Sequence, residues 1–308
     1  MNQQPCSAIS ALTRHNASET KSAVQLVESI NSGSIEWGNG WAIMTKSWLD
    51  EMTWQNAAEA FKKTDVAVIC CGATHPHGVA CPLGTDTFVA EGMGERIGKK
   101  ANAIVVPTIP FGYNTYHMDF PGCIDIPRQH LADIYKDVCE SLYKWGIRKL
   151  VFLSPHGGNH SIIEDVAFRL RYEKGMLSAL VTYDLAGQVK PNLTDYHSEG
   201  MVDEASMMLY LRPGTAHPER VKFKGFKNSF GPQILTLRNG KFKFRNGEIR
   251  ILNTTKDITD NAEWGNTPKA TDMSNATREL GEDIIETAVD YIVEFIEEFA
   301  KVEIPRPK

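Results

Sequence analysis

Two histidines and one aspartate stand close together in segment 72–86, which reads Gly-Ala-Thr-His-Pro-His-Gly-Val-Ala-Cys-Pro-Leu-Gly-Thr-Asp. The histidines are His75 and His77, and the acid is Asp86. Residues two apart in an extended segment point the same way, so both imidazoles can reach one ion. The alternative is that the histidines are solvated and that Asp86 interacts with the dipole of the helix it begins. This segment alone leaves both interpretations open.

A second histidine-containing loop begins at Pro155 and continues His156-Gly157-Gly158-Asn159-His160. Each of the two loops follows a short apolar run, 65–71 or 149–154, of the kind that predicts a buried parallel strand. Ligands bind at the carboxyl ends of such strands, where neighbouring loops converge. We expect Asn159 to cap the helix that begins near His160. Convergence of the two loops favours a metal site over packing.

Two further segments carry candidate residues. The loop 108–123 is long for a connection and contains Tyr116 and His117; long loops tend to be functional, but a surface histidine stacked among aromatic rings explains His117 equally well. Segment 196–204 contains His197, Glu199 and Glu204 at the start of a helix that ends by Pro213. Acids at a helix start can simply interact with its dipole.

Composition excludes several classes of protein. The chain has 308 residues, 42% hydrophobic content and a net charge of −5 with acids and bases interspersed, which argues against nucleic acid or a membrane surface as a partner. The N-terminus lacks a signal pattern, so we expect a cytoplasmic protein. The six cysteines include no Cys-x-x-Cys pair, and adjacent Cys70 and Cys71 are typical of a buried strand.

Strand and helix patterns alternate along the chain, which predicts an α/β fold with a mostly parallel sheet. Expected strands are 65–71, 103–107, 149–154 and 176–183, and expected helices include 86–98, 131–145 and 274–301. Another helix is expected after Thr53, and a weaker one at 19–30. We expect an N-terminal arm at 1–45, one domain at 46–308, and a β-hairpin insertion at 221–252 with an Asn239-Gly240 turn. No dinucleotide, phosphate-loop or serine-elbow motif is present.

Several short segments, in this order, resemble the creatininase (creatinine amidohydrolase) family from about residue 48 to the C-terminus. They are Leu49-Asp-Glu-Met-Thr-Trp, Gly72 to His77-Gly with Pro82-Leu-Gly-Thr-Asp86-Thr, Ile109-Pro-Phe-Gly112 with His117 and Phe120-Pro-Gly122, His156-Gly-Gly-Asn159, Glu204-Ala-Ser206, and Trp264-Gly265-Asn-Thr-Pro268 with Ala270-Thr. The resemblance implies a three-layer α/β/α fold, a small-molecule substrate, and a homo-oligomer, often a hexamer.

The resemblance also implies a centre of one or two divalent ions (zinc, manganese or iron) that hydrolyses cyclic or linear amides through a metal-activated water. The family's metal-ligand positions fall on His77, Asp86, His156 and Glu204, with Asp86 as the bridge between two ions. We assign His197 as the proton shuttle and give Glu204 a share in catalysis. His117, Asn159, Gly157 and Tyr116 are assigned to the substrate pocket.

The sequence departs from the family pattern at His75, where the family usually has a glutamate, and at Ala80, where it has a second histidine. Replacing a carboxylate by an imidazole removes a negative charge and should change the metal preference. The interval from His197 to Glu204 is also longer than usual. These departures leave open a formamide hydrolase, a hydrolase of an inositol-derived ring ketone, and a family member that binds a polar small molecule without turnover. If the protein were a structural subunit instead, the histidines and Asp86 would lie apart.

Overall fold

The computed structural model describes residues 48–305 except 194–200, 223–224, 228, 239 and 264–271. All of these residues belong to the part of the chain that begins at Lys46. The arm at 1–45, its boundary and the helix expected at 19–30 therefore stay predictions. None of the described helices is long and apolar enough to cross a membrane.

A four-stranded parallel sheet with the order β2-β1-β3-β4 forms the centre of the described structure. Its strands are β1 (Val66–Cys71), β2 (Ile104–Ile109), β3 (Lys149–Leu153) and β4 (Leu177–Val181). Ala67 of β1 is in register with Ile104 of β2 and with Leu150 of β3. All six residues of β1 are buried, as expected for a continuous apolar run in a sheet covered on both faces.

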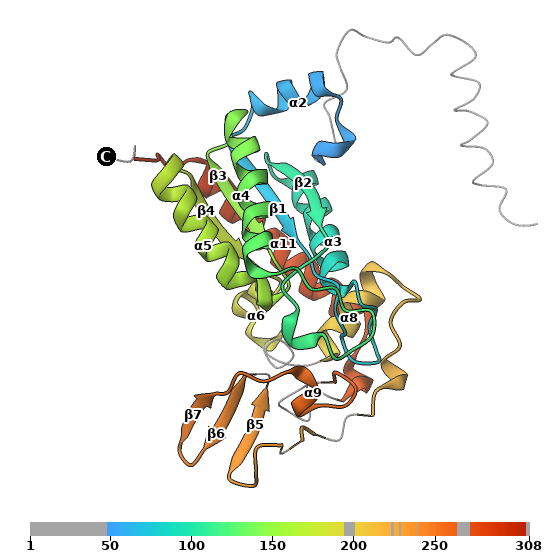
Figure 1. Cartoon of the computed structure of the whole chain (residues 1–308). Helices are drawn as coiled ribbons and strands as arrows, with labels where there is room; N and C mark the ends of the chain where they lie inside the picture. The colour runs from blue at the N-terminus through green and yellow to red at the C-terminus, as the bar shows by residue number, and fades with distance from the viewer. Residues whose placement is uncertain are drawn as a thin grey trace, which may run out of the picture. The chain divides into compact units, whose positions relative to one another are not determined.

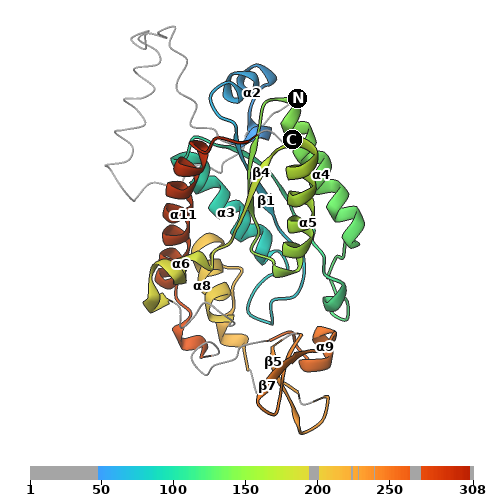
Figure 2. The ribbon, with the colours of Figure 1, turned by 90° about the vertical axis from the view of Figure 1, so that its left-hand side faces the viewer.

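Helices cover both faces of the sheet, which confirms the three-layer α/β/α fold (Figures 1 and 2). On one face, β1 residues Ala67, Ile69 and Cys71 pack in a core with α4 (Arg128–Lys144) and α5 (Gly157–Lys174). Alternate β1 residues Val66, Val68 and Cys70 pack on the other face with α3 (Thr85–Lys100), α8 (Met201–Leu211) and α11 (Arg278–Ala300). The period of two in the strand thus assigns each side chain to one layer.

Capping side chains explain where two helices begin. Thr53 accepts a hydrogen bond from the backbone N–H of Asn56 at the start of α2 (Trp54–Phe61), as its sequence predicted. Thr277 does the same for Leu280 at the start of α11. The expected end of α3 near Gly98 is wrong, because the helix continues to Lys100. Ile97 is completely buried in the core, and this packing outweighs the penalty of about 1 kcal/mol for a helical glycine.

Short helices complete this part of the chain. They are η1 (Leu49–Glu51), η2 (Thr115–His117), α6 (Leu185–Val189), η3 (Pro191–Leu193), η4 (Pro218–Arg220), α9 (Thr255–Ile258) and η5 (Met273–Asn275).

A second, antiparallel sheet has the order β5-β6-β7, with β5 (Ile234–Arg238), β6 (Lys241–Phe244) and β7 (Gly247–Arg250). Strands β5 and β6 form the hairpin that the sequence predicted. Strand β7 adds a third strand, which the sequence pattern did not indicate. Phe242 is buried against Phe230. The small sheet and α9 lie beyond the carboxyl ends of the central strands in both views (Figures 1 and 2).

Candidate metal centre

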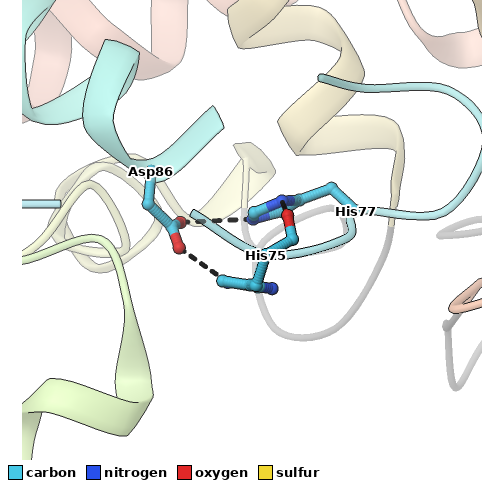
Figure 3. Close-up of side chains that lie close together, drawn as sticks. All are labelled: His75, His77 and Asp86. Carbon is cyan, nitrogen blue, oxygen red and sulfur yellow. Dashed lines mark hydrogen bonds and ion pairs between the residues drawn. The ribbon is translucent and has the colours of Figure 1, made fainter. Parts of the chain in front are cut away.

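Asp86 lies in the first turn of α3 and points toward two histidines of the loop that follows β1 (Figure 3). Nε2 of His75 is 2.8 Å from Oδ2 of Asp86, and Nε2 of His77 is 3.3 Å from Oδ1. Ligand atoms of these three residues all lie within 4.8 Å of one another. The structure therefore brings together the residues of segment 72–86 that the sequence singled out.

A backbone carbonyl faces Nδ1 of both rings. Nδ1 of His75 donates to the carbonyl of Pro76, and Nδ1 of His77 donates to the carbonyl of His75, each at 3.0 Å. In the tautomer in which Nδ1 donates to its carbonyl, Nε2 of the neutral ring presents a lone pair to Asp86. Metal-binding histidines are held in the same way, with the second ring nitrogen donating to a carbonyl or carboxylate.

His156 joins this group from the second loop, as the sequence predicted. Its Nδ1 lies 3.2 Å from Oδ2 of Asp86, and its Nε2 donates to the carbonyl of Tyr113 at 3.0 Å. His156 therefore faces the same carboxylate as the two histidines of the first loop. His156 is the residue just before α5, so the parallel strands β1 and β3 deliver their loops to a single point.

The expected capping role of Asn159 is wrong, because α5 already begins at Gly157. Its buried side chain instead connects two other segments: Nδ2 donates to the carbonyl of Gly72, and Oδ1 accepts from the N–H of Tyr113. Asn159 thus holds the loop after β1 to the loop after β2. Its assignment to the substrate pocket stays a prediction.

Burial and neighbouring charges set the protonation of the cluster. His75, His77, Asp86 and His156 are only 1–6% exposed, which rules out solvated loop histidines. Burial and the neighbouring rings of His77 and His156 lower the pKa of His75 to about 3. Burial opposes the charged form of His77, but the charges of Asp86 and Glu204 outweigh it and raise the pKa to about 9. The imidazoles likewise hold the pKa of Asp86 well below its ordinary value, against the effect of burial.

This donor set fits a divalent cation. Oδ2 of Asp86 lies within 3.2 Å of a ring nitrogen of His75 and of one of His156. Such a group could hold a cation, because imidazole and carboxylate are ligands of zinc, iron and manganese. The short distances are contrary to what a purely structural subunit with scattered histidines would show.

His117 lies beside the cluster and is buried, so it is not a surface histidine. Its ring stacks on that of His75 at a centroid distance of 4.3 Å, and the ring of Tyr116 lies 4.4 Å away. Burial, followed by the charge of His75, lowers the pKa of His117 well below its ordinary value. Burial raises the pKa of Tyr116. Both side chains thus line the cluster in neutral form.

Glu204 lies in the first turn of α8, and burial raises its pKa to about 7. Two nearby carboxyls are also shifted upward by burial: the pKa of Asp203 rises to about 9 and that of Asp184 to about 6. Glu204 is not among the three residues whose ligand atoms lie within 4.8 Å of one another, so its role as a ligand stays a prediction. His197 and Glu199 lie outside the described residues.

Packing requires a glycine at only one of the two paired positions in the second loop. A side chain at Gly158 would meet Nε2 of His156, the carbonyl of Tyr113 and the hydroxyl of Tyr116, all within 2.7 Å. Gly157, which the sequence assigned to the pocket, has nothing within 4 Å of such a position. Gly158 is therefore the position where the backbone must approach the histidine closely.

Three residues that position or cover the cluster had no distinct signal in the sequence. Asp125 accepts hydrogen bonds from the N–H of Asn114 and the hydroxyl of Thr115, which shapes the loop before His117. The hydroxyl of Thr255 in α9 lies 2.8 Å from Nδ1 of His117. Glu263 is 1% exposed and lies against Gly78. Proximity of Glu263 to the family segment at 264–268 was the only available hint.

A three-layer α/β/α fold with a buried His/Asp cluster at the carboxyl edge of its parallel sheet defines the class of protein. The chain belongs to the creatininase family, because the family profile described as creatinine amidohydrolase matches residues 50–296.

Sequence relatives with known roles span parts of the chain. A mycofactocin precursor peptide peptidase of Mycolicibacterium smegmatis is 29% identical over 154 residues, which cover 48% of this chain and 58% of the relative. A creatinine amidohydrolase of Pseudomonas putida is 26% identical over 200 residues, which cover 58% of this chain and 77% of the relative. The chain thus spans only somewhat more than half the length of the first of these relatives.

Solved structures show the same fold. The crystal structure of a creatinine amidohydrolase (creatininase) aligns with a TM-score of 0.66 at 21% identity and covers 84% of this chain and all of that one. A putative creatinine amidohydrolase from Bacteroides fragilis aligns with a TM-score of 0.62 at 23% identity and covers 86% of this chain and all of that one.

Proposed function

We propose that this protein is a metal-dependent hydrolase that cleaves an amide or related carbonyl compound at the His/Asp cluster. The observation that carries the proposal is the convergence of ring nitrogens from His75 and His156 on one carboxylate oxygen of Asp86, while His77 faces the other oxygen. Aligned creatininase structures described as "Creatininase Mn" and as "Zn-Zn type" support a divalent ion in such a fold.

Asp86 is suited to bridge two ions. In this proposal His75, His77, His156 and Glu204 would hold the ion or ions together with Asp86. Three imidazoles with one carboxylate favour zinc or iron over manganese, which prefers oxygen ligands. A divalent ion held here supplies Lewis acidity for polarising a substrate carbonyl and ionising water.

Proton transfer falls to the residues around the cluster. Burial raises the pKa of Glu204 to about 7 in the metal-free protein. As a ligand it would be ionised and would take part in catalysis through the ion that it holds. His197 remains our proposed shuttle to the leaving group. The neutral rings of His117 and Tyr116, together with Gly157 and Asn159, would form the substrate pocket.

The substrate is proposed to be a small polar cyclic amide or a short peptide. The relatives named above act on creatinine and on a precursor peptide, which supports both classes. A formamide and an inositol-derived ring ketone are the alternatives that His75 leaves open, and binding without turnover is the alternative of another class. We also propose a homo-oligomer, up to a hexamer, which light scattering would detect.

A hydrolysis screen with added zinc, manganese or iron tests the proposal. The panel should contain creatinine, short peptides, N-formyl compounds and inositol-derived ketones, with His156→Ala as the variant that lacks one ligand. We expect one substrate class to be cleaved, the cleavage to stop with a chelator, and His156→Ala to lose it. Turnover that survives both treatments would show that the cluster does not carry the reaction.

A further inference from the structure

Glu263 is a buried acid that the metal cluster does not use. Its side chain is 1% exposed, and neither carboxylate oxygen has a hydrogen-bond partner among the residues that the structure describes. Leaving a carboxylate buried without partners is costly. Protonation would remove the charge but would still leave a hydroxyl and a carbonyl oxygen unpaired. Such an exception in a folded protein calls for a ligand.

The backbone around Glu263 is held in an unusual turn. Ala262 is completely buried and has a φ of 54°, in the left-handed region that residues other than glycine rarely adopt. The side chain of Asn261 accepts hydrogen bonds from the N–H of Glu263 and from the hydroxyl of Thr259. The turn therefore directs Glu263 inward at a conformational cost, as is common at binding sites.

Contacts place Glu263 beside the candidate metal centre. A side chain on Gly78, the residue after His77, would meet Cγ of Glu263 at 3.2 Å and Sδ of Met201 at 3.0 Å. Met201 is the first residue of α8, which carries Glu204. At the other end of the same segment, Thr255 contacts His117. The segment 255–263 thus covers two of the histidine loops, and Glu263 lies between the His77 loop and α8.

We infer that Glu263 binds a positively charged nitrogen group of the substrate, either an ammonium or an amidinium such as a guanidinium. A cation with several N–H donors would satisfy both oxygens and neutralise the charge. The inference rests on the proposed function, since the cation would belong to the substrate of the same site.

Thermal unfolding of the metal-free protein in a chelator tests this inference without requiring turnover. Methylammonium and methylguanidinium probe the two kinds of cation, and methylurea is a neutral counterpart of the second. We expect at least one cation, at ten times its dissociation constant, to raise the unfolding midpoint of the wild-type protein by roughly 3 °C, and methylurea to leave it unchanged. The cation that raises the midpoint shows whether the substrate group is an ammonium or an amidinium.

Glu263→Gln removes the charge and keeps the shape. We expect this variant to lose the cation-dependent shift. Glu164→Gln, at an exposed position of α5, is the matched control and should keep the shift. Equal midpoints of the wild-type protein with methylguanidinium, methylammonium and methylurea would overturn the inference, whether or not Glu263→Gln folds.

Elemental analysis separates a substrate cation from a metal ion. Glu263→Gln should retain as much zinc as the wild-type protein after metal loading and dialysis. A drop in bound zinc would make Glu263 a metal ligand and overturn the inference. Failure of the hydrolysis screen, in contrast, would leave the cation-dependent shift unaffected, so the two proposals can fail separately.

Discussion

The carboxylate of Asp86 is contacted by three imidazole rings that come from two different loops. Charge is unevenly divided among these rings, since the pKa of His77 is raised to about 9 and that of His75 is lowered to about 3. One carboxylate cannot stabilise three imidazolium ions at once. The ring of His75 therefore stays neutral, which is the form that binds a metal ion.

The pH dependence of stability tests whether burial raises the pKa of Asp184, which lies near the acids of α8. Burial raises its pKa from 3.8 to about 6, so between these values the folded chain holds a proton that the unfolded chain has lost. The contribution of Asp184 to the free energy of unfolding therefore falls as the pH rises through this window and stays low above it. Asp184→Asn should stabilise the protein by on the order of 2 kcal/mol at pH 7.5 and have little effect near pH 4.

Urea denaturation at both pH values measures this difference. Asp133→Asn, at an exposed position in α4, is the control and should change little at either pH. An Asp184→Asn variant with the same stability difference at pH 4 and pH 7.5 would show that the carboxyl of Asp184 has an ordinary pKa.

At the scale of elements, position 78 in the loop after β1 requires a glycine for two reasons. Gly78 has a φ of 63°, and an added side chain would approach Met201 and Glu263 closely. Gly146 has a φ of 103° but nothing within 4 Å of an added side chain. Comparing substitutions at the two positions therefore separates the cost of a strained backbone from the cost of a steric contact.

Gly146→Ala should cost about 1–2 kcal/mol, because only the left-handed backbone is strained. Gly78→Ala should cost more than Gly146→Ala and should also weaken zinc binding, since the loop that carries His77 has to move. Denaturation curves and zinc titrations of the two variants check this pair of expectations. Equal losses of stability, with unchanged zinc affinity in both, would mean that the contact with Met201 and Glu263 is unimportant.

Periodic patterns predicted the elements of the sheet well, because the buried strands are continuous apolar runs. β1 and β3 begin and end within one residue of the expected ranges. Predictions failed where a polar side chain binds backbone groups of distant segments and not of its own helix. Asn159 was expected to cap α5, but bonds to Gly72 and Tyr113 hold two loops together instead. Such contacts join residues far apart in the chain, so a local pattern cannot indicate them.

The sequence likewise predicted some of the site residues and missed others. His75, His77, Asp86 and His156 were found from the sequence because they follow strand ends, where chemistry concentrates in this type of sheet. Thr255 and Glu263 were missed because they reach the cluster from a segment beyond the second sheet. Their residue types are ordinary for a surface, and only the fold shows that both are buried.

For the whole molecule, every described residue of the cluster lies in the part of the chain after Lys46, which also contains the complete four-stranded sheet. A protein comprising residues 46–308 should therefore fold cooperatively and bind zinc with the affinity of the full chain. Calorimetric unfolding and a zinc titration of the two proteins check this. Loss of the cooperative transition or of zinc binding after truncation would show that the domain needs residues 1–45.

Zinc binding by the wild-type protein and by Asp86→Asn tests whether the His/Asp cluster is a metal centre. Titration calorimetry gives the affinity, and elemental analysis after dialysis gives the stoichiometry. We expect one or two zinc ions per chain in the wild type, and an affinity at least about 100-fold lower in Asp86→Asn, because all three imidazoles face this carboxylate. Asp165→Asn, an exposed position in α5, should bind like the wild type. Equal zinc affinity and stoichiometry in wild type and Asp86→Asn would contradict a metal centre at this site.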